Sequence, residues 1–151
     1  MDSPEKPCFN IERVWMGRFP SGGDLLRTLA EFASENGIQC GVILGIGAVK
    51  KACVGFYDQD GKRYERIEFN GDMEILNLTG NISIKEGKPF VHAHIILSDN
   101  TGRSFGGHLL EGTEVFVFEY KVFQLNRDGG PLQRELEKGS GLFLWKAEEA
   151  G

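Results

Sequence analysis

The alternation of apolar and polar residues predicts extended strands over most of this chain. Short stretches rich in Val, Ile, Leu and Phe are separated by turns of Gly, Asp, Asn and Pro, a pattern typical of sheet-rich folds. The expected strands cover residues 8–19, 39–49, 52–57, 64–69, 74–84, 89–98, 103–110 and 114–125, with a short last strand at 142–145.

One segment follows helical spacing instead. Its apolar residues recur every three or four positions between residues 25 and 35, Asp24 is a suitable N-cap, and Asn36–Gly37 is a suitable left-handed end. With no repeat or linker apparent, we expect a single domain over 1–151 with its core at about 8–146. The predicted fold class is α+β, a largely antiparallel sheet flanked by one main helix.

Composition and charge limit the classes of function that this chain can have. The net charge is −5 and the pI is near 5.2, and no basic cluster exceeds Lys50–Lys51, so binding to DNA is disfavoured. The first residues do not resemble a signal peptide, and no apolar run has the length of a membrane span. Three cysteines without a Cys-x-x-Cys pair favour free thiols and a cytoplasmic location.

All three histidines lie close together in the sequence: His92, His94 and His108. Alternate residues of a strand share a face and lie about 6–7 Å apart, so the His-x-His pair can reach one metal ion. A third histidine from the next strand would complete a three-nitrogen site with one open position, as in catalytic zinc sites. The alternative is that each histidine is a hydrogen-bonded core residue.

The turn between the two histidine strands decides whether the third ring joins the others. A two-residue loop at Asn100–Thr101 would place His108 on the opposite face. A three-residue loop with Gly102 in the left-handed conformation would set His94 opposite His108, and glycine favours that conformation. We therefore predict the three-residue loop, although a bulge at Gly106–Gly107 would change the register.

Several glutamates are candidates to assist such a site. Glu111 follows His108 by three residues, and Glu74, Glu114 and Glu119 lie on expected strands. Glu111 and Glu74 are the candidate catalytic residues, as a general base or as a partner that orients a histidine; the alternative is a solvated surface position. For an anionic substrate the candidate partners are three arginines, Arg18, Arg63 and Arg103.

One further motif, rich in glycine, gives little indication of function. Gly45-Ile-Gly follows an apolar stretch, but neither a third glycine nor a helix comes next, which disfavours a dinucleotide loop. Close backbone packing in a buried strand explains these glycines better.

The chain resembles the PPC domain, named for plants and prokaryotes conserved. The resemblance is carried by Gly22-Gly-Asp-Leu-Leu, Gly45-Ile-Gly-Ala-Val, Glu74-Ile-Leu-Asn-Leu-Thr-Gly-Asn, Pro89-Phe-Val-His-Ala-His and Gly106-Gly-His-Leu-Leu-Glu-Gly-Thr. It implies a mixed sheet with a flanking helix, assembled as a homotrimer. Plant members combine the domain with AT-hook motifs in nuclear DNA-binding proteins, and this chain has no such hook.

A more distant resemblance bears on the histidines. Acetolactate decarboxylases and related zinc-dependent ester hydrolases share the architecture and hold zinc with a His-x-His pair and a later histidine. Carried onto this chain, the implied ligands are His92, His94 and His108. The decarboxylases' catalytic acids and arginine have no assignable counterparts here.

Three hypotheses follow. The first is a trimeric metal-binding domain, with zinc (or iron, nickel or manganese) holding water or a small polar ligand, and with hydrolase or lyase activity if it is an enzyme. The second is a non-enzymatic module for DNA-linked regulation or protein association. The third makes the histidines ligands at a trimer interface.

Overall fold

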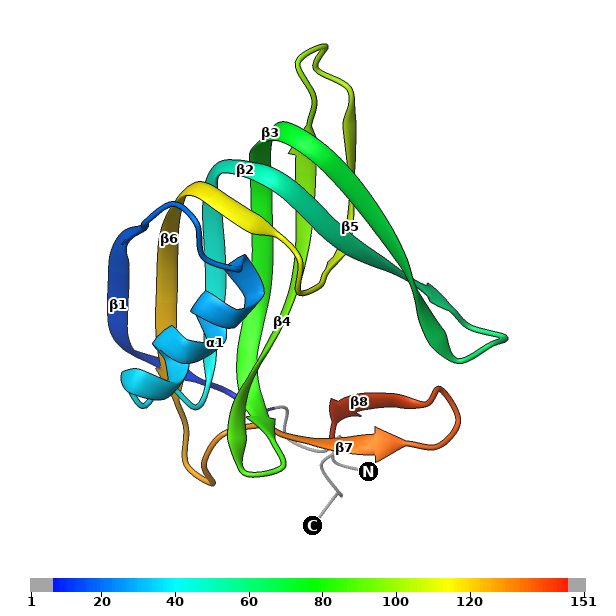
Figure 1. Cartoon of the computed structure of the whole chain (residues 1–151). Helices are drawn as coiled ribbons and strands as arrows, with labels where there is room; N and C mark the ends of the chain where they lie inside the picture. Colours follow the sequence, from blue (N-terminus) through cyan, green and yellow to red (C-terminus); the bar gives the residue numbers. More distant parts are fainter. Residues whose placement is uncertain (1–6, 147–151) are drawn as a thin grey trace.

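The structure, a computed structural model, describes residues 7–146 and contains one helix and eight strands in that range (Figure 1). The elements are β1 (Asn10–Phe19), α1 (Leu25–Glu35), β2 (Gly41–Asp58), β3 (Arg63–Lys85), β4 (Lys88–Ser98), β5 (Ser104–Leu109), β6 (Glu114–Asn126), β7 (Gln133–Glu137) and β8 (Leu142–Trp145). All pairings are antiparallel except the short parallel one between β3 and β7. The predicted α+β class, with a mixed and largely antiparallel sheet, is confirmed.

The helix forms where its apolar spacing predicted it. Asp24 caps it by accepting a hydrogen bond from the Arg27 backbone N–H at 3.0 Å, and Gly37 has φ +64° just beyond its end. Leu25, Leu29 and Ala33 are buried against the sheet. Within the described residues, no helix is long and apolar enough to cross a membrane.

The prediction of separate strands was wrong in two places. Residues 41–49 and 52–57 belong to the single strand β2, which Gln39 and Cys40 precede, and residues 64–69 and 74–84 belong to β3. The two strands stay paired and shift register together, between Val49 and Lys51 on β2, which face Met73 and Asn70 on β3. A bulge bends paired strands without ending them, so polar and glycine residues here mark a bend instead of a turn.

This bend lets the sheet close on itself. The first half of β2 pairs with β6 and its far half with β5, while β3 pairs with β4; β4 and β5 pair with each other. Strands β2, β5, β4 and β3 thus form a continuous hydrogen-bonded ring, and the far end of the β2–β3 hairpin extends away from the helix (Figure 1).

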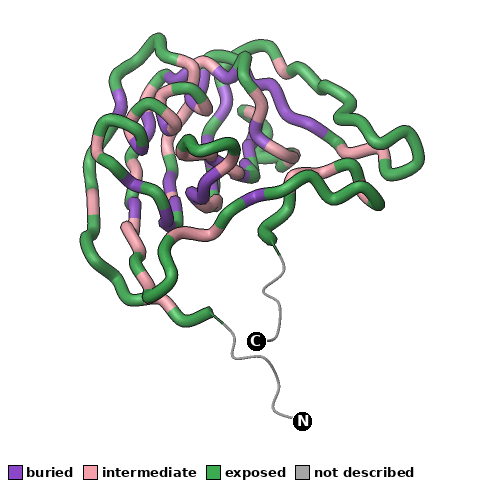
Figure 2. The backbone as a smooth tube through the Cα atoms, turned by 90° about the horizontal axis from the view of Figure 1, so that it is seen from below, coloured by how far each residue is buried: buried purple, intermediate pink, exposed green. Residues whose placement is uncertain are grey.

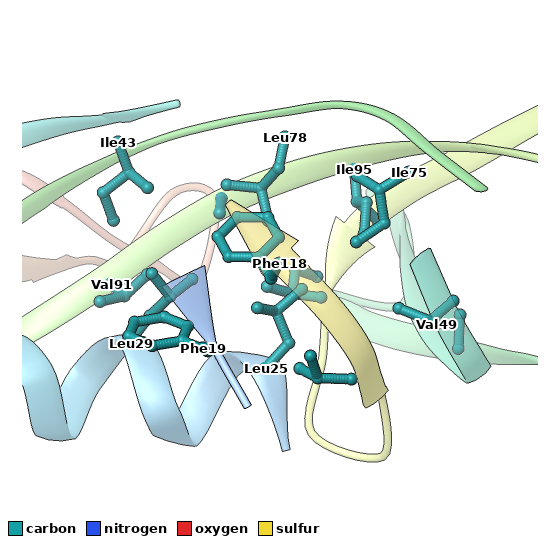
Figure 3. Close-up of a cluster of buried hydrophobic side chains, with 14 of the residues drawn as sticks. Phe19, Leu25, Leu29, Ile43, Val49, Ile75, Leu78, Val91, Ile95 and Phe118 are labelled. Carbon is teal, nitrogen blue, oxygen red and sulfur yellow. The ribbon is translucent and has the colours of Figure 1, made fainter. Parts of the chain in front are cut away.

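The core lies between the helix and the sheet, where side chains from most elements interlock (Figure 3). Phe118 is fully buried at its centre. A Cβ added at Gly45 would lie 2.0 Å from the Phe118 ring. One added at Gly47 would lie 2.1 Å from the Val117 carbonyl oxygen, so the expected close backbone packing is confirmed. Burial is concentrated around the helix, whereas the tips of the β2–β3 and β7–β8 hairpins are mainly exposed (Figure 2).

Strand β7 was not predicted. Its sequence, Gln-Arg-Glu-Leu-Glu, has a single apolar residue and no apolar alternation. It forms because Gln133 and Arg134 pair with the end of β3 and because β8 pairs along its other edge.

Candidate metal centre

Strand β4 presents its histidines on the face opposite the core. Val91, Ala93 and Ile95 are buried, while the intervening His92 and His94 point to the other side of the sheet. The alternation that fills the core therefore also puts both imidazoles on one outward face.

The β4–β5 turn has the predicted three-residue form. The Asp99 N–H donates to the Arg103 carbonyl at 3.1 Å, the Gly102 N–H donates to the Asp99 carbonyl at 3.0 Å, and Gly102 has φ +81°. The Asp99 carboxylate accepts hydrogen bonds from the Thr101 hydroxyl and from the backbone N–H groups of Thr101 and Arg103, which lowers its pKa to about 2. The turn is thus held by its own first residue.

The resulting register sets His94 opposite His108, as predicted. Pairing runs without a shift from Ser98–Ser104 to His94–His108, so the alternative bulge at Gly106–Gly107 does not form. A Cβ at Gly106 would lie 2.0 Å from the Ile95 carbonyl oxygen, so glycine here lets β5 approach β4 closely.

The three histidines converge. One ring nitrogen from each of His92, His94 and His108 lies within 4.8 Å of the others, and the ring centroids are 4.9–5.4 Å apart. The Nε2 atoms of His92 and His94 are 3.3 Å apart. Two nitrogens bound to one tetrahedral zinc at about 2.0–2.1 Å would be about 3.3 Å apart, so this donor set fits a zinc ion.

The electrostatic environment keeps imidazoles neutral. Burial lowers the pKa of His108 to about 4, with further lowering by the other two histidines and Arg134. The pKa of His92 is also lowered, first by burial and then by Arg134 and His94. Neutral imidazole has the lone pair that a metal needs, so both rings are in the ligating form at neutral pH.

Tyr64 is a functional candidate that sequence reasoning missed. It comes from the start of β3, and its hydroxyl lies 3.4 Å from His108 Nδ1 with the two rings 4.5 Å apart. Contact at Nδ1 leaves Nε2 of His108 for a metal. The signal was hidden because Tyr64 reaches His108 only after the β2–β3 hairpin bends back.

Arg134 is the second missed residue, because β7 itself was not expected. It is 8% exposed, and its Nη2 donates to the Asn81 side-chain oxygen at 2.8 Å. Asn81 pairs with His92 across β3 and β4, so the guanidinium lies next to the histidine cluster.

The two predicted catalytic glutamates lie outside the group of three histidines. The Glu111 carboxylate pairs with Arg27 at 3.0 Å, and Glu74 lies on β3 opposite Ser98, five positions from the residue that faces His94. Within residues 7–146, the group of potential ligands contains only the three histidines, with no carboxylate. A catalytic role for Glu111 and Glu74 stays a prediction.

The expected anion-binding arginines also lie elsewhere. Arg103 pairs with Asp99 in the β4–β5 turn at 3.0 Å. Arg18 lines a hollow on the outer face of β1, β6 and β2, and Arg63 is exposed at the start of β3.

The fold and cluster together define an α+β domain with a candidate three-histidine metal centre on the outer face of its sheet. Residues 7–126 match the model of the Plants and Prokaryotes Conserved (PCC) domain. The chain belongs to this family, which confirms the resemblance seen in its sequence.

Similar proteins support the assignment. A plant- and prokaryote-conserved (PPC) protein from Pyrococcus horikoshii is 37% identical, with a TM-score of 0.89 over 96% of this chain and 99% of that one. A metal-containing protein from Archaeoglobus fulgidus is 39% identical, with a TM-score of 0.85 over 97% and 100% of the two chains. The bifunctional protein GlmU of Synechococcus sp. (strain JA-3-3Ab) is 32% identical over 91% of this chain, which spans only 21% of that relative.

Two further structures bear on the hypotheses. A protein from Bacteroides thetaiotaomicron, described as a candidate DNA-binding protein, is 28% identical with a TM-score of 0.81 over 95% of this chain and 96% of that one. A Staphylococcus aureus protein described as similar to alpha-acetolactate decarboxylase is 14% identical, with a TM-score of 0.52 over 75% and 52% of the two chains. The second likeness is one of fold alone.

Proposed function

We propose that this protein is a metal-binding PPC-domain protein in which His92, His94 and His108 hold a divalent ion. The observation that carries the proposal is the convergence of one nitrogen from each ring within 4.8 Å. The similarity to a protein described as metal-containing supports it, at 39% identity over nearly the whole chain.

Zinc is the proposed ion. Three imidazoles on a rigid sheet suit its tetrahedral preference and leave a fourth position for water or a small polar ligand. Iron, nickel and manganese also accept imidazole, and the nitrogen spacing does not separate them from zinc.

The proposed activity is hydrolysis, or a lyase step, on a small oxygenated substrate. A bound ion would supply Lewis acidity and lower the pKa of its water toward about 7. The residues of the chain set the environment: Tyr64 orients His108, and Arg134 supplies a fixed positive charge beside the rings. Glu111 and Glu74 are retained as candidate acid–base residues, and Glu111 would first have to leave Arg27.

Turnover tests this activity. Zinc-loaded protein is offered simple esters and 2-hydroxy-2-acyl acids, before and after chelation, with His94→Ala as the site variant. Turnover that disappears on chelation and in His94→Ala supports the proposal. No turnover by metal-loaded protein across this panel would contradict the enzymatic part.

We further propose that residues 1–151 form one domain, with its core at about 8–146, and that this domain self-associates as a homotrimer. The outer face of β1, β6 and β2 carries exposed apolar side chains on its two flanking strands: Val14, Met16, Val42 and Ile46 are 48%, 69%, 37% and 53% exposed. The exposed charged residues Lys121 and Glu119 of β6 lie between them. The apolar residues fall in neighbouring rows of one sheet face, where Val14 and Val42 both flank Phe123. Several large apolar side chains exposed together on one sheet face support an interaction surface there.

The free thiols support a reducing, cytoplasmic location. Cys40 and Cys53 are buried and Cys8 is exposed, and none of the three forms a disulfide.

The second candidate function is a non-enzymatic, DNA-linked regulatory module. It is favoured by the description of the Bacteroides protein and opposed by the net charge of −5. An electrophoretic shift series with duplex DNA at low and high salt tests it, using the wild type and the double variant His92→Ala, His94→Ala. A shift that survives the double substitution supports this candidate, and no shift at low salt counts against it.

A further inference from the structure

Arg134 is held rigidly beside the histidine cluster. Its Nε donates to Ser83 Oγ at 2.7 Å, Nη1 to the Phe143 carbonyl at 2.9 Å and Nη2 to Asn81 Oδ1 at 2.8 Å. Its guanidinium carbon lies 5.3 Å from the Phe90 ring centroid and 5.5 Å from that of Trp145. These contacts fix the direction of the guanidinium plane.

All of these acceptors are neutral. Among residues 7–146, no Asp or Glu forms an ion pair with Arg134, although the residue is only 8% exposed. A buried cation without a counter-charge is costly, so the site favours an anion. A guanidinium has five N–H donors in a planar fork, and three are engaged, which leaves two N–H groups.

The rest of the site adds no negative charge. The three candidate ligands are imidazoles, which bring no negative charge, and the described part of the chain contributes no carboxylate to their group. A divalent ion held there would therefore sit near Arg134 with its own charge uncompensated. Two cationic centres on one sheet face, linked through the cross-strand pair Asn81–His92, would both attract the same anionic ligand.

We propose that this site binds a small organic acid whose carboxylate lies on the free N–H groups of Arg134 and whose second oxygen, a hydroxyl or keto group, reaches the metal. This inference rests on the proposed metal centre. Two oxygen groups are needed because Arg134 and the histidines occupy neighbouring, not identical, positions on the face. Arg134 would select the carboxylate, and Tyr64 would act indirectly, through its contact with His108.

The test uses lactate and its neutral analogue lactamide as probes on the full-length protein loaded with Co²⁺. The visible spectrum of Co²⁺ reports oxygen binding at the metal, and calorimetry gives the affinity. Lactate is expected to change the spectrum and to bind at least about tenfold more tightly than lactamide, because hydrogen bonds to a charged group are the stronger ones.

Variants assign the difference to Arg134. In Arg134→Gln, lactate affinity is expected to fall by about ten- to a hundredfold, while Co²⁺ content and lactamide affinity stay at wild-type levels. Arg134→Lys keeps the charge without the planar fork, and is expected to retain part of the preference for lactate. Arg103→Gln removes an 82% exposed arginine from the same protein and serves as the matched control.

Equal affinity of the wild type for lactate and lactamide would overturn the inference, even if Arg134→Gln fails to fold. Unchanged lactate affinity in a folded, Co²⁺-loaded Arg134→Gln would overturn it as well. Failure of the wild type to take up Co²⁺ would instead overturn the proposed metal centre itself, so the two failures are distinguishable.

Discussion

At the scale of single residues, the cluster depends on side chains that fix ring orientation. We propose that His108 binds the metal through Nε2, because Tyr64 lies 3.4 Å from its Nδ1 and would then be an outer partner of this ligand. Such partners hold the ring in place and select its tautomer.

Replacing Tyr64 by Phe removes only the hydroxyl. We expect metal affinity to fall by about tenfold, because outer partners of metal-binding histidines typically contribute that much or more. Competition with a chromogenic chelator measures the change.

Tyr57→Phe is the control, since the Tyr57 hydroxyl donates its hydrogen bond to the Ser140 carbonyl, in the turn between β7 and β8. Equal metal affinity in Tyr64→Phe and the wild type would show that the Tyr64 hydroxyl does not orient the ring.

Sequence reasoning reached the three histidines but neither Tyr64 nor Arg134. The histidines have a local signal, a two-residue period and one turn. Tyr64 meets His108 across 44 positions, and Arg134 meets Asn81 across 53, so their proximity depends on how the whole sheet bends. A single sequence carries no periodic signal for such contacts.

At the scale of elements, the β4–β5 turn sets the register of the cluster. Gly102 has φ +81°, and within the described residues nothing lies within 4 Å of a Cβ added there, so only backbone strain opposes a side chain. Gly102→Ala is expected to destabilise the fold by about 1–2 kcal/mol, measured by urea unfolding.

Ser104→Ala, at the exposed start of β5, is the matched control and should change stability little. Wild-type stability in Gly102→Ala would contradict the left-handed conformation of Gly102.

The same turn predicts a pH dependence. The pKa of Asp99 is about 2 in the fold against an ordinary value of 3.8, because the folded turn donates hydrogen bonds to its carboxylate. A lowered pKa stabilises the fold above about pH 3.8, and this stabilisation is lost as pH falls toward about 2. The Asp99→Asn variant should therefore lose less stability than the wild type as the pH falls from about 3.8 to about 2. Thermal melts at a series of pH values measure this difference. An unchanged decline would contradict the role of the carboxylate.

The observed helix and strands show which elements a local sequence pattern is sufficient to predict. The helix and the β4–β5 hairpin were predicted because capping residues, glycine and apolar spacing act locally. The bends of β2 and β3 could not be told from turns in the sequence. Glycine and polar residues such as Gly71 and its neighbours occur both at bends within a strand and at turns between strands, and only the pairing with the partner strand separates the two. Strand β7 has no apolar alternation that a sequence could reveal, because the strand forms only through its pairing with β3.

At the scale of the whole molecule, the histidines and the exposed apolar rows share the outer side of the sheet. Met16→Glu puts a charge into these rows and should dissociate the proposed trimer, as seen by light scattering after gel filtration. Ser34→Glu adds the same charge to the exposed side of α1 and should leave the mass unchanged. A wild type of monomeric mass, or an undisturbed trimer in Met16→Glu, would contradict self-association through this face.

The proposed metal centre requires the three imidazoles to hold one metal ion together. Elemental analysis of the purified wild type beside His108→Ala tests this requirement. We expect about one zinc per wild-type chain and almost none in the variant, because two histidines alone bind zinc weakly. Metal-free wild type, or equal metal in both proteins, would contradict the claim.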